Sequence, residues 1–152
     1  MTEVRWLDNV EARAWRGLWV MSQLLFDRLN QELQQRSGLS LAEYDILVRL
    51  SAAPECRLRM STLAEDTRCS RSRLTHQIDR MEAAGLVSRT ACLTDRRGAF
   101  AVLTSKGHRA LEAAAPGHVE DVRTHLIDAL TREQLEQLAA IAGAVQARVT
   151  AR

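Results

Sequence analysis

The segment 57–104 constrains the fold most, because it joins a clear helical period to a β-prone pattern that follows it. Apolar residues recur there at three- and four-residue steps, which places them on one face of a helix over about 71–84. Ser70 is a suitable N-cap for this helix, and Gly85 fits the position that ends it. The residues expected to face the core are Leu74, Ile78 and Met81.

A β-hairpin is predicted directly after that helix. The runs 86–93 and 99–104 are alternating or β-prone, and the turn that joins them is rich in charge. Eleven Lys or Arg residues lie within 57–109 against five Asp or Glu, although the whole chain carries only +2. This segregation suggests a segment that faces a polyanion, and a simple solvated basic face is the alternative.

Two further helix starts precede the central helix. The residues 40–43 and 62–65 both have the pattern of a capping box, with Ser61 as a competing cap for the second. The first of these helices is expected to stop at Pro54. Between them, 57–59 fits a short extended piece.

Long amphipathic helices are predicted at both ends of the chain. One covers 8–36, and helical periodicity returns over 105–149, with a kink or break expected at Pro116-Gly117. A third capping box at 131–134 begins the last helix. The aromatic residues of the first helix need cover, and a second subunit is a natural source of it.

The exposed face of the central helix has the chemistry of a DNA reader. A helix fits the major groove of B-DNA, where its outward side chains reach base edges. Arg71 at the helix start and Arg80 two turns on are better placed for phosphates. A polar solvent face without a ligand is the alternative. The candidates for base contacts are Ser72, Arg73, Thr75 and His76.

The hairpin tip strengthens this reading. An arginine at such a tip can enter a narrow, electronegative minor groove, and Arg97 is the candidate. Asp95 is close enough in sequence to pair with Arg97 and hold its direction. The alternative is a charged turn that binds nothing.

The order of these segments resembles the MarR family of transcriptional regulators. The resemblance is carried by LSLAEYDILVRL (39–50), RLRMSTLAED (57–66), CSRSRLTHQIDRMEAAGLVSR (69–89) and LTDRRGAFAVLTSKG (93–107). It implies a mainly α fold with a small β-wing, namely a winged helix-turn-helix (40–104) with N- and C-terminal dimerisation helices (8–36 and 105–149). The whole chain, 1–152, is then a single MarR-type domain.

The resemblance also implies a function and residue roles. It implies a homodimer that binds double-stranded DNA at a pseudo-palindromic operator, with repression relieved by a small ligand or by oxidation. By position, Arg73 and His76 lie in the groove-reading helix, with Ser70 and Ser72 at its start. Arg97 falls in the minor groove, and Arg96 is expected at a phosphate.

A small aromatic or phenolic effector is expected from the same resemblance. An aromatic wall with one cation suits an aromatic carboxylate, and the candidates in this chain are Trp15, Trp19, Tyr44 and Arg49. These residues are otherwise explained as core and dimer contacts.

Control by oxidation is the second route. The peroxide-sensing relatives carry their reactive cysteine near the start of the first helix, and this chain has no cysteine before Cys56. Cys69 precedes the reading helix, whose dipole and neighbouring arginines favour a thiolate. A small packing residue is the alternative for Cys69.

Other function classes find little support. The sequence has no phosphate-binding glycine loop, HExxH or nucleophile elbow, so no enzyme, cofactor or metal site is expected. A cytoplasmic protein without a membrane span is expected, given the three widely spaced cysteines and the lack of a long apolar run. A helical scaffold dimer that does not bind DNA remains the alternative from another class.

Overall fold

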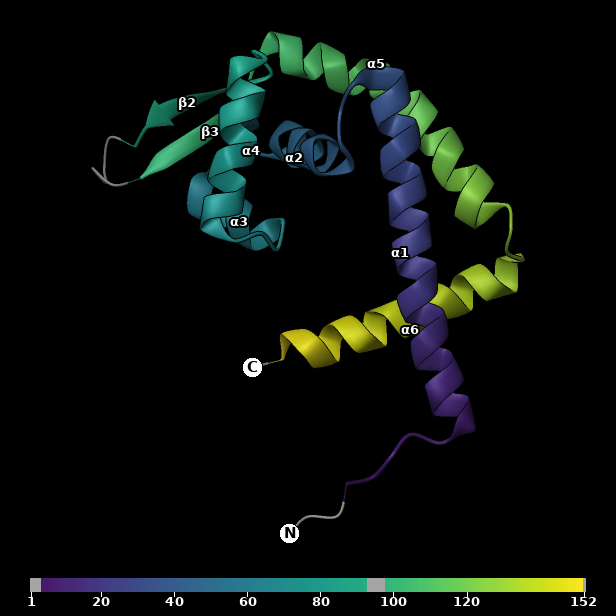
Figure 1. Cartoon of the computed structure of the whole chain (residues 1–152). Helices are drawn as coiled ribbons and strands as arrows, with labels where there is room; N and C mark the ends of the chain where they lie inside the picture. The colour runs from purple at the N-terminus through teal and green to yellow at the C-terminus, as the bar shows by residue number, and fades with distance from the viewer. Residues whose placement is uncertain (1–3, 93–97, 152) are drawn as a thin grey trace. The chain divides into compact units, whose positions relative to one another are not determined.

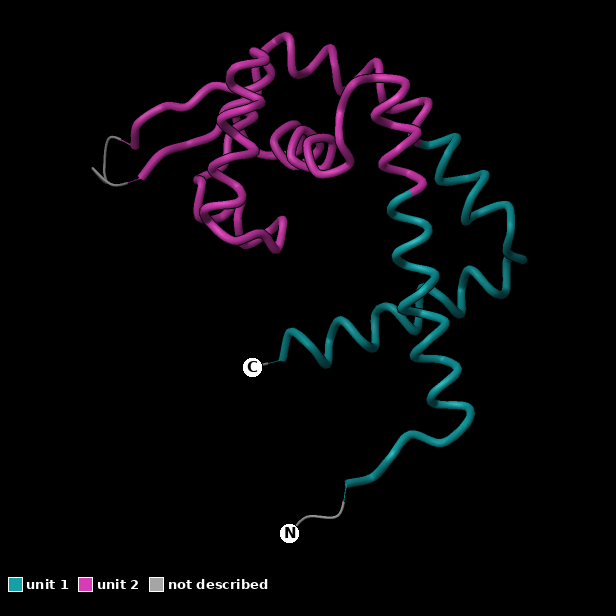
Figure 2. The backbone as a smooth tube through the Cα atoms, in the orientation of Figure 1, with its two compact units in different colours: residues 1–27, 119–152 teal, residues 28–118 magenta. Residues whose placement is uncertain are grey.

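A computed structural model describes residues 4–92 and 98–151. The Cα positions fall into two compact units: one comprises residues 28–118, and the other comprises the two chain ends, up to residue 27 and from 119 onward (Figure 2). The long helices α1 and α5 each contribute to both units. The two units are described separately below.

The chain is mainly helical, with one small sheet (Figure 1). In order, its elements are α1 (Asn9–Ser37), α2 (Leu41–Ala52), a 3-10 turn (Pro54–Cys56), β1 (Arg57–Arg59), α3 (Met60–Asp66), α4 (Arg71–Ala83), β2 (Val87–Ala91), β3 (Ala99–Leu103), α5 (Ser105–Val122), a π-helical turn (Arg123–Ile127) and α6 (Arg132–Thr150).

The sheet is antiparallel, with strand order β1-β3-β2. The predicted hairpin is confirmed: β2 pairs with β3 from Val87↔Leu103 to Ala91↔Ala99. The extended piece at 57–59 is also confirmed, since β1 pairs with the other edge of β3. The sheet therefore ties the hairpin to the segment that leads into α3.

The core of the unit 28–118 lies between α2, α3, α4 and the sheet. The predicted inward face of α4 is confirmed, because Leu74, Ile78 and Met81 are at most 1% exposed. They belong to one hydrophobic cluster with Leu47 of α2 and Leu63 of α3. The opposite face of α4 is thereby left outward.

Local signals predicted most helix ends correctly. Ser40 and Glu43 form a complete capping box at the start of α2, and Thr131 and Gln134 form another at the start of α6. Gly85, which was predicted to end α4, has φ 75°, a region that glycine enters without a steric penalty.

The predicted cap of α3 was wrong. The helix begins at Met60, before both Ser61 and Thr62, and its N-cap Arg59 makes no side-chain capping bond. Arg59 is the last residue of β1 and pairs with Phe100 of β3. The chain thus passes directly from a strand into the helix, and the strand pairing fixes where the helix begins.

A kink or break was expected at Pro116-Gly117, and the break is absent. Helix α5 continues through Pro116, and a change of helix type comes only at Arg123–Ile127. Pro116 and Glu112, one turn earlier, are both exposed. Proline leaves the Glu112 carbonyl without an N–H partner, and on the exposed side of a helix water is available to such a carbonyl.

The unit made of the chain ends is built from amphipathic helices with uncovered apolar faces. Trp15, Leu18 and Trp19 of α1 are each at least half exposed, as are Ile141 and Val145 of α6. No helix in the described part of the chain is long and apolar enough to cross a membrane.

Candidate nucleic-acid interface

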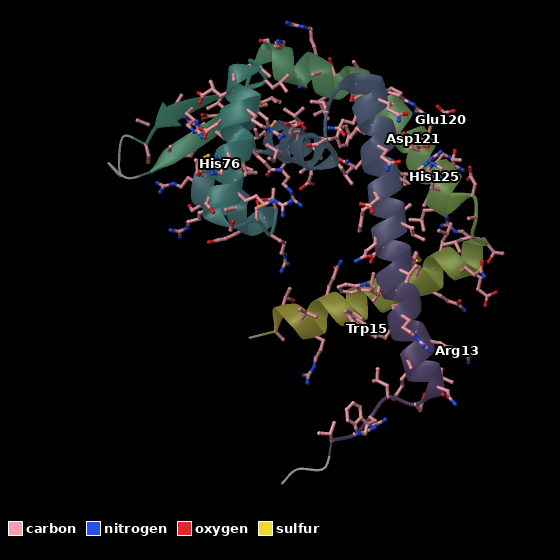
Figure 3. The ribbon with its side chains drawn as sticks, in the orientation of Figure 1. Arg13, Trp15, His76, Glu120, Asp121 and His125 are labelled. Carbon is pink, nitrogen blue, oxygen red and sulfur yellow. The ribbon has the colours of Figure 1, made fainter. Side chains whose placement is uncertain are left out.

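The outward face of α4 carries the residues expected to contact bases. Ser72, Arg73, Thr75 and His76 are all exposed, and Figure 3 shows His76 on this helix. Ser70 caps the helix by accepting a hydrogen bond from the backbone N–H of Arg73 at 3.3 Å. The cap fixes the first turn, from which Arg71 and Ser72 project.

Thr75 differs from its neighbours on this face. Its hydroxyl donates to the carbonyl of Arg71, one turn back, at 2.8 Å. The hydroxyl proton is therefore used within the helix, while the oxygen and the methyl group remain for an outside partner. Thr75 is better suited to an apolar or acceptor contact than to donating.

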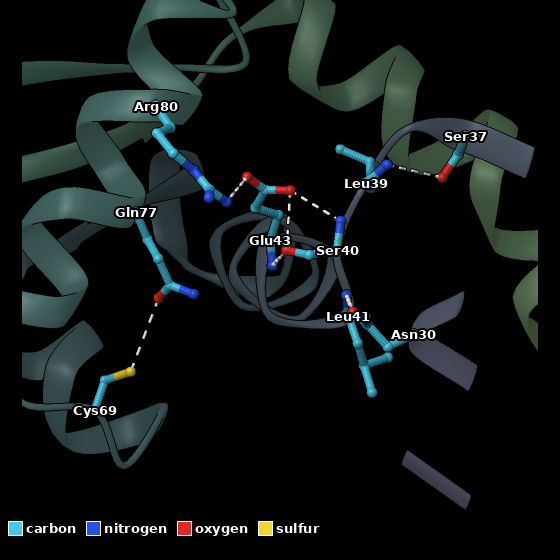
Figure 4. Close-up of polar contacts among 9 residues, drawn as sticks. All are labelled: Asn30, Ser37, Leu39, Ser40, Leu41, Glu43, Cys69, Gln77 and Arg80. Atoms are coloured by element: carbon cyan, nitrogen blue, oxygen red, sulfur yellow. Dashed lines mark hydrogen bonds and ion pairs between the residues drawn. The ribbon is translucent and has the colours of Figure 1, made fainter. Parts of the chain in front are cut away.

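Arg80 is held by α2. Its Nη2 lies 2.6 Å from Oε1 of Glu43, the same residue whose other oxygen accepts from the N–H and hydroxyl of Ser40 (Figure 4). Burial alone raises the pKa of Glu43, but the hydrogen bonds from Ser40 and Arg80 outweigh it and leave the pKa below its ordinary value. One carboxylate thus joins the start of α2 to α4.

Two pockets flank α4. One of about 590 Å³ is lined by Arg73, His76 and Arg80 together with Asn30 and Ser40. Asn30 accepts a hydrogen bond from the N–H of Leu41 at 2.9 Å, which fixes the start of α2 at this wall (Figure 4). The outward face of α4 therefore borders a polar hollow.

The second pocket, of about 420 Å³, lies toward the hairpin. It is lined by Arg71 and Thr75 of α4, and by Arg59, Ser61 and Gly98. Sequence reasoning missed Arg59 and Ser61. The spacing of Arg57 and Arg59 could have indicated that they share one side of a short strand, since side chains two residues apart in a strand point the same way. In the structure both guanidinium groups lie over the Phe100 ring, at 5.1 and 5.6 Å from its centroid.

The tip residues Asp95, Arg96 and Arg97 lie outside the described residues. The hairpin residues on either side of the tip are described: the N–H of Cys92 donates to the carbonyl of Gly98 at 2.9 Å. The thiol of Cys92 is buried and accepts from Arg59 at 3.3 Å. The two strands are therefore joined up to the last described pair.

The residues that follow β3 are hydrogen-bonded to the residues that follow α4. The hydroxyl of Thr104 donates to the carbonyl of Gly85 at 2.6 Å and accepts from the N–H of Gly107. A Cβ at position 107 would overlap the carbonyl oxygen of Leu86. These contacts explain why the motif at 93–107 ends in threonine and, three residues later, glycine.

Arg89 of β2 bonds to several groups of α4, and sequence reasoning missed it. Its Nη2 lies 2.7 Å from Asp79, and its Nη1 lies 2.7 Å from Glu82. Nη2 also donates to the carbonyl of Thr75 at 3.2 Å, and the backbone N–H of Arg89 donates to Glu82 at 2.9 Å. No local sequence pattern signals these pairings.

The chain is similar to known proteins in sequence and in fold. A family model described as MarR family matches residues 39–98. The HTH-type transcriptional regulator PecS of Dickeya dadantii is 30% identical over 125 residues, which are 81% of this chain and 74% of PecS. The chain belongs to the MarR family.

Solved structures extend the likeness over the whole chain. Sco3205, a MarR family transcriptional regulator from Streptomyces coelicolor in complex with DNA, is 40% identical with a TM-score of 0.93, covering 99% of this chain and 94% of Sco3205. AbsC, a MarR family transcriptional regulator from the same organism, is 43% identical with a TM-score of 0.90, covering 98% and 100%. This MarR protein is therefore a DNA-binding transcriptional regulator with a winged helix-turn-helix, and not an enzyme.

The candidate effector residues of this MarR protein fall in both compact units. Trp15 and Trp19 lie together, with ring centroids 5.7 Å apart, and line a pocket of about 260 Å³ with Arg16 and Val20. Figure 3 shows Trp15 on α1. Tyr44 and Arg49 belong to the other unit.

Tyr44 and Arg49 both have partners on the protein. The Tyr44 ring lies 4.6 Å from the His118 ring, and burial raises the pKa of the Tyr44 hydroxyl. The Nε of Arg49 lies 2.8 Å from Asp45, one turn back on α2. An effector carboxylate that used Arg49 would therefore compete with Asp45.

The cysteines are all free thiols. Cys69 is half-buried, and its sulfur lies 3.8 Å from Oε1 of Gln77 on α4 (Figure 4). Within residues 4–92 and 98–151, no cluster of three or more His, Cys, Asp or Glu has the arrangement of a metal site.

Proposed function

We propose that this MarR protein is a cytoplasmic repressor that binds a pseudo-palindromic operator as a homodimer. The observation that carries the proposal is the two-sided character of α4, which buries Leu74, Ile78 and Met81 and exposes Ser72, Arg73 and His76. A helix held so firmly on one side presents its other side in a fixed geometry, which sequence-specific contacts in a major groove require.

The proposed contacts divide by chemistry. Arg73 and His76 contact base edges, since a guanidinium donates two bonds to guanine and an imidazole reaches a base or a phosphate. Ser70, Ser72 and Thr75 lie beside them at the start and flank of the helix. Arg71 and Arg80 contact phosphates, and Arg80 keeps donors for this purpose because Glu43 occupies only part of its guanidinium.

The hairpin contributes a second set of contacts in this proposal. Arg97 enters the minor groove with Asp95 directing it, and Arg96 contacts a phosphate. Two observations support this: the sequence of the tip is basic, and Gly98, directly after the tip, lines the same pocket as Arg71.

A homodimer is proposed because the chain-end helices expose large apolar side chains that a second copy would cover. Leu18 of α1 is 50% exposed and Ile141 of α6 is 61% exposed. A two-fold dimer would place the two reading helices in successive major grooves, about 34 Å apart. Repression then follows from occupation of an operator that overlaps a promoter.

Gel-shift titration and footprinting on the promoter next to the gene test this proposal. We expect two protected half-sites one helical turn apart, and an affinity that falls at least about a hundredfold between about 50 and 200 mM salt. A dimer that shows no protected dyad and no salt-dependent binding would instead support the helical scaffold.

We further propose that a small aromatic carboxylate releases the DNA. The support is the pair Trp15 and Trp19 with Arg16 beside a pocket of about 260 Å³, a wall of aromatic rings with one cation. Titration with salicylate should quench tryptophan fluorescence and weaken DNA binding in parallel. Unchanged fluorescence and unchanged affinity would remove the effector from the proposal.

A further inference from the structure

We infer that Arg89 is a positioning residue, which sets the direction of the reading helix α4 relative to the hairpin strand β2 without contacting DNA. The inference deepens the proposed function and rests on it. The observation behind it is the convergence of three groups of α4 on one guanidinium: the carboxylates of Asp79 and Glu82 and the carbonyl of Thr75.

The contacts leave Arg89 little freedom. Two of its nitrogens face two different carboxylates at 2.7 Å each, and its own backbone N–H donates to Glu82. Charge-assisted bonds from a planar guanidinium fix an orientation as well as a distance. The bonded groups of α4 span two helical turns, from Thr75 to Glu82, so the bonds restrain the helix axis and not a single point.

Both elements that Arg89 joins approach DNA in the proposed complex. Thr75 lies within the exposed reading face, and β2 leads to the hairpin tip. A small rotation of α4 about its axis would change the positions of Arg73 and His76 relative to the hairpin. Recognition that needs both elements at once is sensitive to such a rotation, because base contacts tolerate little displacement.

Direct contact between Arg89 and a phosphate is disfavoured by the same geometry. The Arg89 side chain is 27% exposed, and two carboxylates already surround its charge. With one cation and two anions, the cluster carries a net −1 and repels a phosphate. Charge alone therefore predicts that removing Asp79 or Glu82 improves DNA binding, whereas positioning predicts the opposite.

Variants of the whole chain in which the charges of this cluster are neutralised separate the charge explanation from the positioning explanation. Asp79→Asn and Glu82→Gln each remove one negative charge and one ion pair with Arg89, leaving only a neutral amide oxygen as acceptor. The triple variant Arg89→Met, Asp79→Asn, Glu82→Gln removes the ion pairs and leaves the cluster neutral. We expect each single variant to bind operator DNA more weakly, and the triple variant to bind about tenfold more weakly, the size typical of coupling within such networks.

Matched controls and a second readout exclude a general loss of folding. Asp66→Asn removes an exposed carboxylate of α3 and should bind as tightly as wild type or slightly more tightly. Arg89→Lys keeps a cation but not the fork, and should bind with an affinity between those of wild type and the triple variant. All affinities are measured well below the melting temperature of each variant, with dimerisation checked by sedimentation.

The outcomes are distinct. Weaker binding by Asp79→Asn and by the triple variant, with a salt dependence like that of wild type, supports positioning, since no phosphate contact has been lost. Binding equal to or tighter than wild type in either variant overturns it. If wild-type protein binds no promoter DNA at all, the proposed function fails and this inference fails with it.

Discussion

The two compact units differ in where their apolar side chains lie. Every buried hydrophobic residue among those described falls within 28–118. Of the large hydrophobic residues that are exposed in the described chain, only Val48 lies in that unit, and the others lie in the chain ends. The unit 28–118, which is the DNA-reading unit in the proposed function, thus has a core of its own, whereas the chain-end helices carry apolar faces without one.

This difference indicates how the two units are stabilised. Fully burying a Leu, Val or Ile side chain contributes about 1.5–3 kcal/mol, so the unit 28–118 gains its stability from its own contacts. The chain ends gain comparable stability only when another surface covers them. Their stability should therefore depend on protein concentration, while that of the reading unit should not.

Substitution in the core should produce the largest effect. Leu50 is fully buried, so Leu50→Ala removes its packing and leaves a cavity, at a cost of about 2–5 kcal/mol in the free energy of unfolding. Urea denaturation followed by circular dichroism measures it. Val48→Ala, on the same helix but 39% exposed, should cost less than about 0.5 kcal/mol. Equal losses in the two variants would show that the reading unit has no core of its own.

A charge on the exposed face of α6 should disrupt association. Val145 is 51% exposed, and Val145→Glu would bury an unpaired carboxylate in the proposed dimer, weakening it at least about a hundredfold. Sedimentation equilibrium measures this. Val48→Glu places the same charge on an exposed valine of the reading unit and should leave the dimer intact. Dissociation by Val48→Glu alone would place the interface elsewhere.

Removing one base contact should have a smaller effect, confined to DNA binding. Arg73→Ala should weaken operator binding by about 1–3 kcal/mol and relax specificity at the contacted base pair. Arg71→Ala should weaken binding to all sequences alike. It should also reduce the slope of log affinity against log salt concentration by about 1, the value for one lost phosphate contact. Fluorescence anisotropy at several salt concentrations measures both. Arg148→Ala, on exposed α6, should change neither quantity.

Sequence periodicity was sufficient for the face of α4, because the spacing of Leu74, Ile78 and Met81 is a local property of a helix. The capping boxes at Ser40 and Thr131 were predictable for the same reason, since each involves residues three apart. The apolar stripes of the first and last helices could also be predicted, and the aromatic residues of the first helix gave the expectation of a second subunit.

Interactions between distant elements were not predictable from the sequence. The start of α3 coincides with the end of the strand in which Arg59 pairs with Phe100, and the local cap candidates Ser61 and Thr62 do not override that pairing. Arg80 was expected only at a phosphate, yet Glu43, far back in the sequence, holds it. Arg89 drew no attention because a basic residue in a strand gives no hint of the two carboxylates that the helix presents to it.

The smallest expected effect concerns Glu43, which links α2 to α4. Its pKa in the folded protein lies below the ordinary value of 4.5, so the folded state favours the ionised form. The stabilisation is complete above the pKa of the unfolded chain and is lost as the pH falls through the folded-state pKa. Glu43→Gln should therefore destabilise the protein by about 1 kcal/mol at pH 7, a typical cost for a lost capping interaction.

The pH dependence of this difference is the sharper test. Urea denaturation at pH 7 and again near pH 3 should show the gap between wild type and Glu43→Gln shrinking at the lower pH, because the wild-type carboxylate is then protonated as well. Ser40→Ala removes the bonds of its hydroxyl but keeps the Arg80 pair, so its own deficit should shrink less. A gap that stays constant between the two pH values would mean that Glu43 acts through its shape, and that its charge does not hold the reading helix.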